Sequence, residues 1–134
     1  MSDVRMSAVV PSLRVASIAA VLPFYRALGF EVAFAFSGDE FTDCAVRSDA
    51  TFVRLDADAE RPISLFLERD RGTAGGCVHL MVGPSDNVDR IEARLRAAGF
   101  VPDLAATDQP WGMRELHVRD ADDNLVVVGG LLQG

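Results

Sequence analysis

The residues best suited to binding or catalysis gather near the C-terminus, in residues 108–128. This segment holds the only tryptophan, Trp111, and the proline and glycine that flank it are typical of a turn. After the turn Met113, Glu115 and His117 alternate with other residues, so a strand would place all three on one face. An indole ring attracts flat and cationic molecules, and a nearby carboxylate adds charge attraction. Glu115 and His117 could also approach a metal ion.

Other reactive side chains are sparse. His79 lies in an apolar run, where a histidine usually packs into the core, and its alternative role is that of a weak metal-ligand candidate. Cys44 and Cys77 lack the spacing of a disulfide or metal motif, so we expect buried, reduced thiols of low reactivity. The sequence contains no nucleophile constellation and no glycine-rich phosphate loop.

The first half of the chain predicts a strand, a helix and several further strands. Residues 8–15 form the first strand, which contains Pro11 at an edge, a bulge or a bend. Ser17 caps a helix that Gly29 ends, and Pro23 means that this helix either begins late or is kinked. Four strands follow, at residues 30–36, 41–47, 51–55 and 63–67.

The second half repeats this order. A strand at 77–82 precedes a helix that Ser85 or Asp86 caps and Gly99 ends. The strands that follow are expected at residues 100–104, 113–118 and 125–128, the last two around an acidic turn at 120–124. We therefore predict one α+β domain over residues 1–134, with module one at 7–69, a linker at 70–76 and module two at 77–131. Two curled antiparallel sheets would surround a cleft, with the helices outside.

The composition of the chain limits which classes of binding partner are expected. The chain of 134 residues carries 20 acidic and 13 basic side chains, a net charge of −7, which disfavours nucleic acid and favours a cationic ligand. No apolar run is long enough to span a membrane. Residues 1–6 lack the shape of a signal peptide, so we expect a cytoplasmic protein.

Three stretches carry a resemblance to a known family. They are Pro-Phe-Tyr-Arg-Ala-Leu-Gly-Phe at 23–30, Val-His-Leu-Met-Val at 78–82 and Gln-Pro-Trp-Gly-Met-Arg-Glu, followed by Arg-Asp-Ala-Asp-Asp-Asn, within 109–124. The chain resembles the vicinal oxygen chelate superfamily, and within it the glyoxalase/bleomycin-resistance proteins, with the bleomycin-binding branch most similar. The resemblance implies paired βαβββ modules and a homodimer whose ligand clefts are built from both subunits.

The resemblance also implies site residues. Phe34, Phe41 and Trp111 match aromatic residues of that branch's cleft, although core packing remains the alternative for each. Pro11 matches the proline that bends an arm toward the other subunit. The implied ligand-binding set is Phe34, Phe41, Trp111, Met113 and Glu115, with attraction added by Asp39, Glu40, Asp43 and Asp108.

Enzymes of the superfamily hold a divalent metal with residues from the first and last strands of each module. The matching positions fall at residues 10–12, Phe66, His79 and Val127, and only His79 is a metal ligand. We therefore expect no catalytic residue and no cofactor, and a dimeric protein that sequesters a small cationic or aromatic ligand such as an antibiotic. The alternatives are a metal-dependent lyase, isomerase or dioxygenase, and a regulatory or structural dimer with a vestigial cleft.

Overall fold

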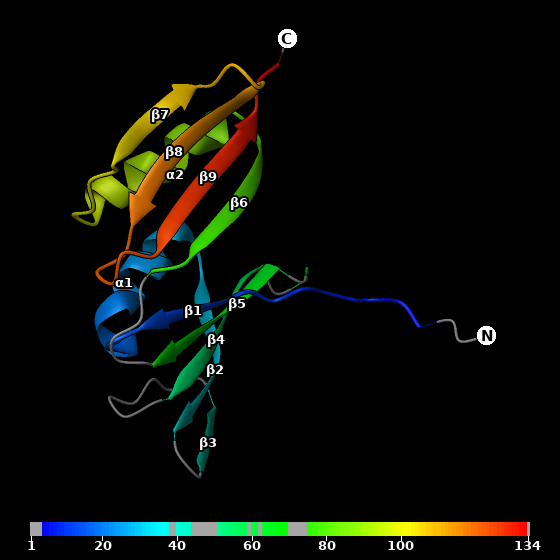
Figure 1. Ribbon diagram of the computed structural model, residues 1–134, viewed down its shortest axis with the longest axis vertical. Coiled ribbons are helices and arrows are strands. Elements are labelled where there is room, and N and C mark those ends of the chain that lie inside the picture. The colour runs from blue at the N-terminus through cyan, green and yellow to red at the C-terminus, as the bar shows by residue number, and fades with distance from the viewer. Residues whose placement is uncertain are drawn as a thin grey trace.

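The computed structural model describes residues 4–37, 40–43, 51–58, 60–61, 63–69 and 75–133. Its elements form two modules of similar order (Figure 1). Module one contains β1 (Ser12–Val15), α1 (Ile18–Leu28), β2 (Glu31–Ser37), β3 (Glu40–Asp43), β4 (Phe52–Asp58) and β5 (Ile63–Arg69). Module two contains β6 (Cys77–Pro84), α2 (Asp86–Ala97), β7 (Leu104–Asp108), β8 (Met113–Arg119) and β9 (Leu125–Leu131).

Each module folds into one sheet. The strand order is β1-β5-β4-β2-β3 in module one and β6-β9-β8-β7 in module two. β1 runs parallel to β5 and β6 runs parallel to β9, while the other paired strands are antiparallel. The predicted α+β fold of paired modules is confirmed, and each sheet is mixed because its first strand joins its last in the same direction.

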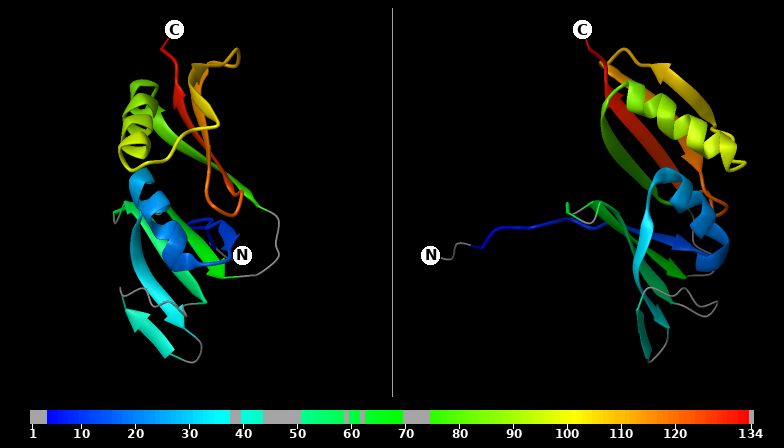
Figure 2. Two further views of the ribbon diagram at one scale, coloured as in Figure 1. Left: turned by 90° about the vertical axis from the view of Figure 1, so that its left-hand side faces the viewer. Right: turned by 180° about the vertical axis from the view of Figure 1, so that it is seen from behind.

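A helix covers one face of each sheet, and the core lies between them. Figure 2 shows α2 along one face of the module-two sheet and α1 beside the module-one sheet. Within the described residues no helix covers the opposite faces, which we call the open faces. The helix residues buried against the sheets are Ile18, Val21, Leu22, Phe24, Tyr25 and Leu28 of α1 and Val88 and Leu95 of α2.

The ends of α1 follow the sequence signals. Ser17 accepts a hydrogen bond from the Ala20 backbone N–H at 3.2 Å, which satisfies one free donor of the first turn. Gly29 adopts the left-handed conformation with φ 112°, where a Cβ would be unfavourable. The helix begins directly after Ser17 and continues through Pro23, so it does not begin late.

The start of α2 differs from the prediction. Ser85 occupies the capping position in a helical backbone conformation, and its side chain makes no capping hydrogen bond. The Asn87 side chain instead donates to the Val82 carbonyl oxygen at 2.7 Å and so holds the end of β6 against the first turn of α2. Sequence identified the helix but not the side chain that fastens its beginning.

Several strand limits also differ. β1 begins only at Ser12, and residues 4–11 before it form an extended N-terminal arm. β4 continues to Asp58, beyond the predicted limit. The predicted strand at 100–104 is wrong, because β7 begins at Leu104; Pro102 cannot donate to a ladder and Phe100 packs edge-on against Phe24, with ring centroids 5.2 Å apart.

Buried polar contacts join the two modules. The Tyr25 hydroxyl of α1 donates to the Asp120 carboxylate, in the turn between β8 and β9, at 2.6 Å. In the same turn Asn124 donates to the Arg14 carbonyl oxygen at 2.9 Å and accepts from the Gly76 backbone N–H at 2.6 Å. The acidic turn therefore ties module two to β1 and α1. In the described part of the chain, neither helix is long and apolar enough to cross a membrane.

Candidate ligand-binding site

The two faces of β8 have different roles. Leu116 and Val118 are buried on the side of α2, where Arg114 also contacts the Asp89 side chain of that helix. Strand alternation therefore places Met113, Glu115 and His117 on the open face. The strand predicted at 113–118 is confirmed, because β8 spans Met113–Arg119.

Trp111 lies in the turn between β7 and β8. The Gln109 backbone N–H donates to the Met113 carbonyl oxygen at 2.7 Å, which closes the turn, and Gly112 has φ 86°. The indole is 62% exposed, and its Nε1–H donates to Glu115 Oε2 at 3.0 Å. One edge of the ring is thus held by Glu115, while most of its surface is available for stacking.

Glu115 is the most enclosed acidic group of the open face of module two, with an exposed fraction of 9%. Its Oε2 accepts from Trp111, and its Oε1 lies 3.3 Å from His117 Nε2. Both carboxylate oxygens therefore have a defined neighbour. Such a group can accept a hydrogen bond from a cationic ligand in a largely enclosed setting, where charge attraction is less screened than in water.

Gly129 of β9 lies directly beneath methionine side chains on this part of the sheet. A Cβ at that position would lie 3.0 Å from Met113 Cε and 3.7 Å from Met81 Sδ. It would also lie 3.9 Å from Glu115 Cγ. Two thioether side chains therefore converge over a strand position without a side chain, beside Glu115, and thioethers pack well against aromatic rings.

The open face of module one carries an aromatic cluster. Phe52 is its centre, with ring centroids 6.2, 5.1 and 5.9 Å from those of Phe34, Phe36 and Phe66. All four side chains are half-buried. Beside them Arg54, Asp56 and Ser64 form a hydrogen-bonded group on the same face, with Ser64 Oγ donating to Asp56 Oδ1 at 2.6 Å.

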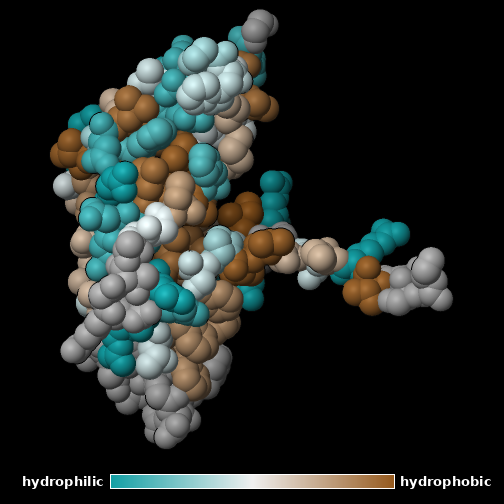
Figure 3. Space-filling model, viewed as in Figure 1, coloured by the Kyte–Doolittle hydropathy of each residue, from teal (hydrophilic) through white to brown (hydrophobic). Residues whose placement is uncertain are grey.

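A largely apolar groove of about 400 Å³ lies between the modules. The residues that line it include Phe30, Leu65, Leu80, Pro11 and His79. Figure 3 shows apolar residues gathered where the N-terminal arm leaves the body. His79 is exposed rather than packed in the core, so the core prediction for this residue is wrong; β6 is an edge strand whose one face lacks a covering helix.

The predicted site residues fall into two places. Trp111, Met113 and Glu115 come together on module two, and Phe34 belongs to the aromatic cluster of module one. The Phe41 side chain lies outside the described residues, although its backbone pairs with that of Phe36. The β7–β8 turn and the β2–β3 strands lie at opposite ends of the molecule, so one chain does not unite the two groups (Figure 1).

Sequence reasoning missed part of both groups. Phe36, Phe52 and Phe66 complete the aromatic cluster, and Met81 completes the thioether pair. Alternation along residues 30–36 places Phe36 on the face of Phe34, which was an available signal. The predicted acids Asp39, Glu40 and Asp43 have side chains outside the described residues.

Asp108 is paired within the chain. Its Oδ1 accepts from Arg114 Nη1 at 2.8 Å, and Arg114 also donates to Asp89 Oδ1 at 3.0 Å. Hydrogen bonds from Arg114 to Asp89 and to Asp108 raise the pKa of the Arg114 guanidinium above its usual value. One guanidinium is thus shared by two carboxylates, so the attraction predicted from Asp108 is reduced but not removed.

The chain belongs to the Glyoxalase/Bleomycin resistance protein/Dioxygenase superfamily, because the sequence model of that family matches residues 6–128. Among solved structures, lactoylglutathione lyase from Agrobacterium tumefaciens has 18% identity and a TM-score of 0.69, covering 93% of this chain and 94% of that one. TioX from Micromonospora sp. ML1 has 24% identity and a TM-score of 0.63, covering 92% and 97%. A bleomycin-binding protein complexed with bleomycin has 16% identity and a TM-score of 0.62, covering 96% and 100%. At these identities the likeness is one of fold alone, and no curated protein matches the chain.

The family's metal-ligand positions do not fit a metal centre here. Residues 10–12 supply no imidazole or carboxylate, Phe66 belongs to the aromatic cluster, and Val127 is an apolar side chain that is 3% exposed. Only His79 offers a ligating atom. Within the described ranges, no three His, Cys, Asp or Glu side chains come together as a metal site. Cys77 is exposed, which corrects the expectation of a buried thiol; the Cys44 expectation lies outside the described residues.

Proposed function

We propose that this protein binds a small cationic or aromatic molecule and withholds it from its target without changing any bond, as an antibiotic-sequestering protein does. The observation that carries the proposal is the pairing of Trp111 with Glu115, an exposed indole fixed by its N–H to a largely enclosed carboxylate. The ring offers a stacking surface, and the carboxylate offers the counter-charge beside it. The bleomycin-binding protein, solved with bleomycin, supports the capacity of this fold for such a role.

We propose that the protein forms a homodimer. Each chain carries two separated half-sites, the aromatic cluster on module one and the Trp111–Glu115 pair on module two. Two copies related by a two-fold axis can bring the module-one half-site of one subunit opposite the module-two half-site of the other, twice over. A ligand in such a cleft would be enclosed by aromatic rings on one side and by Trp111, Met113 and Glu115 on the other.

The N-terminal arm is the second feature that supports a dimer. Val4, Met6 and Val9 have exposed fractions of 88%, 91% and 81% along an arm that runs away from the body (Figure 2). Apolar side chains held in solvent are unfavourable and usually mark a contact surface. We assign the arm to the apolar groove of the partner subunit, with Pro11 directing the chain across.

The test of binding uses Trp111 as the only tryptophan. Bleomycin-type and other cationic aromatic antibiotics are titrated into the metal-free protein, and saturable quenching at one ligand per half-site pair is the expected result. Glu115→Gln should weaken a cationic ligand about tenfold, because a hydrogen bond to a charged group is lost while the acceptor for the indole N–H is kept. Glu60→Gln, at an exposed turn, removes the same charge elsewhere and should leave the affinity unchanged.

Three results would count against the proposal. The first is an unchanged ligand affinity in Glu115→Gln and in Trp111→Ala, the latter followed by calorimetry. The second is the absence of saturable quenching with every compound. The third is a stoichiometric nickel, zinc, manganese or iron content of the purified protein, which would favour the metal-dependent enzyme instead.

Sedimentation equilibrium tests the dimer. Met6→Glu and Val9→Glu place charges where the arm should meet an apolar groove, and we expect each to shift the protein toward monomer. Ser7→Glu adds the same charge to the same exposed arm without removing an apolar group, so it should weaken the dimer less. A wild-type protein that sediments as a monomer would refute the dimer, and equal behaviour of all three variants would refute the role of the arm.

A further inference from the structure

We propose that Arg114 is a positioning residue that holds Trp111 in place from the opposite face of β8, an inference whose meaning for binding rests on the function proposed above. Arg114 stands between Met113 and Glu115 in the chain but points to the side of α2. A ligand on the open face therefore does not contact it. Its guanidinium can act on the site only through the residues that it holds.

Arg114 closes the base of the turn that carries Trp111. Asp108, the last residue of β7, is paired in register with Arg114 across the ladder, and their side chains meet at 2.8 Å. Directly above this pair the Gln109 backbone N–H donates to the Met113 carbonyl oxygen, and the turn follows. The ion pair thus joins the two ends of the segment from which the indole projects.

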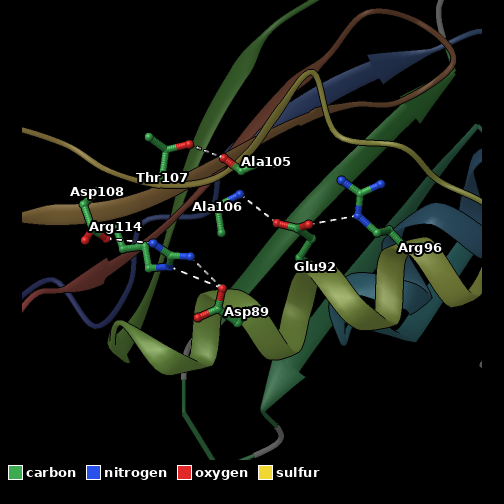
Figure 4. A network of polar contacts seen from close by, with 8 residues as sticks. All are labelled: Asp89, Glu92, Arg96, Ala105, Ala106, Thr107, Asp108 and Arg114. Carbon is green, nitrogen blue, oxygen red and sulfur yellow. Dashed lines mark hydrogen bonds and ion pairs between the residues drawn. The ribbon is translucent and has the colours of Figure 1, made fainter.

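The same guanidinium fastens the base of the turn to α2. Its Nη2 and Nε lie 3.0 and 3.3 Å from Asp89 Oδ1, so Arg114 bridges two carboxylates on two different elements (Figure 4). Arg114 itself is the least exposed partner, with a side-chain exposure of 27%. A fork of donors that holds two acceptors in fixed directions restrains geometry more than a single contact does.

Glu92 supplies a second attachment of β7 to α2. Its Oε1 accepts from the Ala106 backbone N–H at 2.7 Å, and its Oε2 accepts from Arg96 Nε at 2.9 Å (Figure 4). Ala106 lies where the register of β7 with β8 shifts, between Leu104 and Thr107. β7 is therefore attached to α2 at two places. Glu92 holds it at Ala106, and Arg114 holds it at Asp108, where the turn begins.

Trp111 needs such a restraint because little else holds it. Trp111 is 62% exposed, and among the described residues the polar contact of its indole is one hydrogen bond to Glu115. A mobile ring must be immobilised when a ligand stacks on it, which costs affinity, whereas a ring already in place does not. The arrangement assigns that preorganisation to Arg114, Asp108 and Asp89.

The decisive variant is Arg114→Gln, compared with Arg119→Gln. Arg119 lies on the same strand but at the end away from the turn, where it pairs with Asp103 at 2.9 Å and donates to the Asp123 carbonyl oxygen at 3.2 Å. Its replacement therefore also removes the two contacts of one guanidinium, without touching the turn. Time-resolved fluorescence anisotropy of the ligand-free protein reports the local motion of Trp111 directly. We expect a larger amplitude of fast indole motion in Arg114→Gln, the wild-type amplitude in Arg119→Gln, and partial recovery in Arg114→Lys.

Ligand titration is the second measurement. Bleomycin-type compounds should bind Arg114→Gln roughly three- to tenfold more weakly, in proportion to the ordering of one side chain, and should bind Arg119→Gln as they bind the wild type. Equal anisotropy decays in Arg114→Gln and wild type would overturn the positioning role. Absence of binding by the wild-type protein would overturn the proposed function alone, because the anisotropy is measured without a ligand.

Discussion

Replacement of Tyr25 by phenylalanine tests the contact that joins the two modules. Tyr25 is fully buried, and its hydroxyl donates to Asp120 Oδ2 at 2.6 Å. The same carboxylate accepts from the Asn124 side chain at 2.9 Å and from the Asp122 and Asn124 backbone N–H groups at 2.9 and 3.0 Å. Tyr25→Phe therefore removes one of four donors and leaves Asp120 with the other three.

The expected loss follows from that count. A hydrogen bond to a charged group contributes about 2 kcal/mol, and the remaining donors prevent the larger cost of an unpaired buried carboxylate. For a domain of this size that loss corresponds to a decrease of roughly 7 °C in Tm. Equilibrium unfolding in urea near neutral pH measures the free energy directly.

The pH dependence gives a second, sharper expectation. Burial, and then the contact with Asp120, raise the pKa of the Tyr25 phenol far above its usual value. Below about pH 10 the phenol is protonated in both the folded and the unfolded chain, so its contribution is constant. Above about pH 10 only the unfolded chain loses the proton, so stability should fall by about 1.4 kcal/mol per pH unit. Tyr25→Phe lacks this slope, so the two stability curves should cross near pH 11.5, roughly 1.5 units above the free phenol pKa.

The composition of the chain makes this measurement clean. Tyr25 is the only tyrosine, and all 13 basic residues are arginines, so no lysine ionises in the same range. All other ionisable side chains are the same in the two variants, so their effect cancels in the difference. Phenolate absorbance should rise only when circular dichroism shows unfolding. A rise near pH 10 in a protein that remains folded would refute the buried Tyr25–Asp120 contact.

Three other substitutions test the packing and the site. Gly130→Ala should lower the free energy of unfolding by roughly 1–3 kcal/mol, because its Cβ would lie 2.8 Å from the Ser85 Cα. In Gly129→Ala the new Cβ meets only the end of a side chain at 3.0 Å, so equal thermal unfolding of the two variants would contradict this reasoning. Asn124→Ala should cost roughly 2–4 kcal/mol in denaturant unfolding, because a fully buried side chain leaves its partners unsatisfied, and a loss below about 1 kcal/mol would count against it. Phe52→Ala should weaken an aromatic ligand roughly tenfold by calorimetry, and unchanged affinity would remove the aromatic cluster from the site.

Features that depend on sequence neighbours were predictable. The cap at Ser17, the left-handed Gly29 and the alternation along β8 each involve residues within a few positions of one another. The same is true of the Trp111 turn, because proline and glycine act on the local backbone. These local signals were sufficient to place Met113, Glu115 and His117 on one face of a strand that follows the Trp111 turn, before any pairing between strands was known.

Features that depend on strand order were not predictable. The run at 77–82 indicated a strand of mostly apolar residues, and this context led us to expect His79 and Cys77 to be buried. β6 is instead an edge strand with one open face, and both side chains are exposed. The aromatic cluster likewise requires the register of β2, β4 and β5, which brings Phe52 beside Phe36 and Phe66.

The positions of the acidic side chains limit which ligands would fit the proposed site. Asp120 accepts from four donors, so it offers no free acceptor to a ligand, whereas Asp108 shares the Arg114 guanidinium with Asp89 and offers only part of its charge. Glu115 differs, because its two contacts are with an indole and an imidazole rather than with a guanidinium. Under the proposed function, attraction of a ligand at the Trp111 turn therefore depends mainly on the Glu115 carboxylate beside the indole. A ligand that uses both must carry its cationic group adjacent to its flat ring, so a compound with a distant charge should gain little from Glu115.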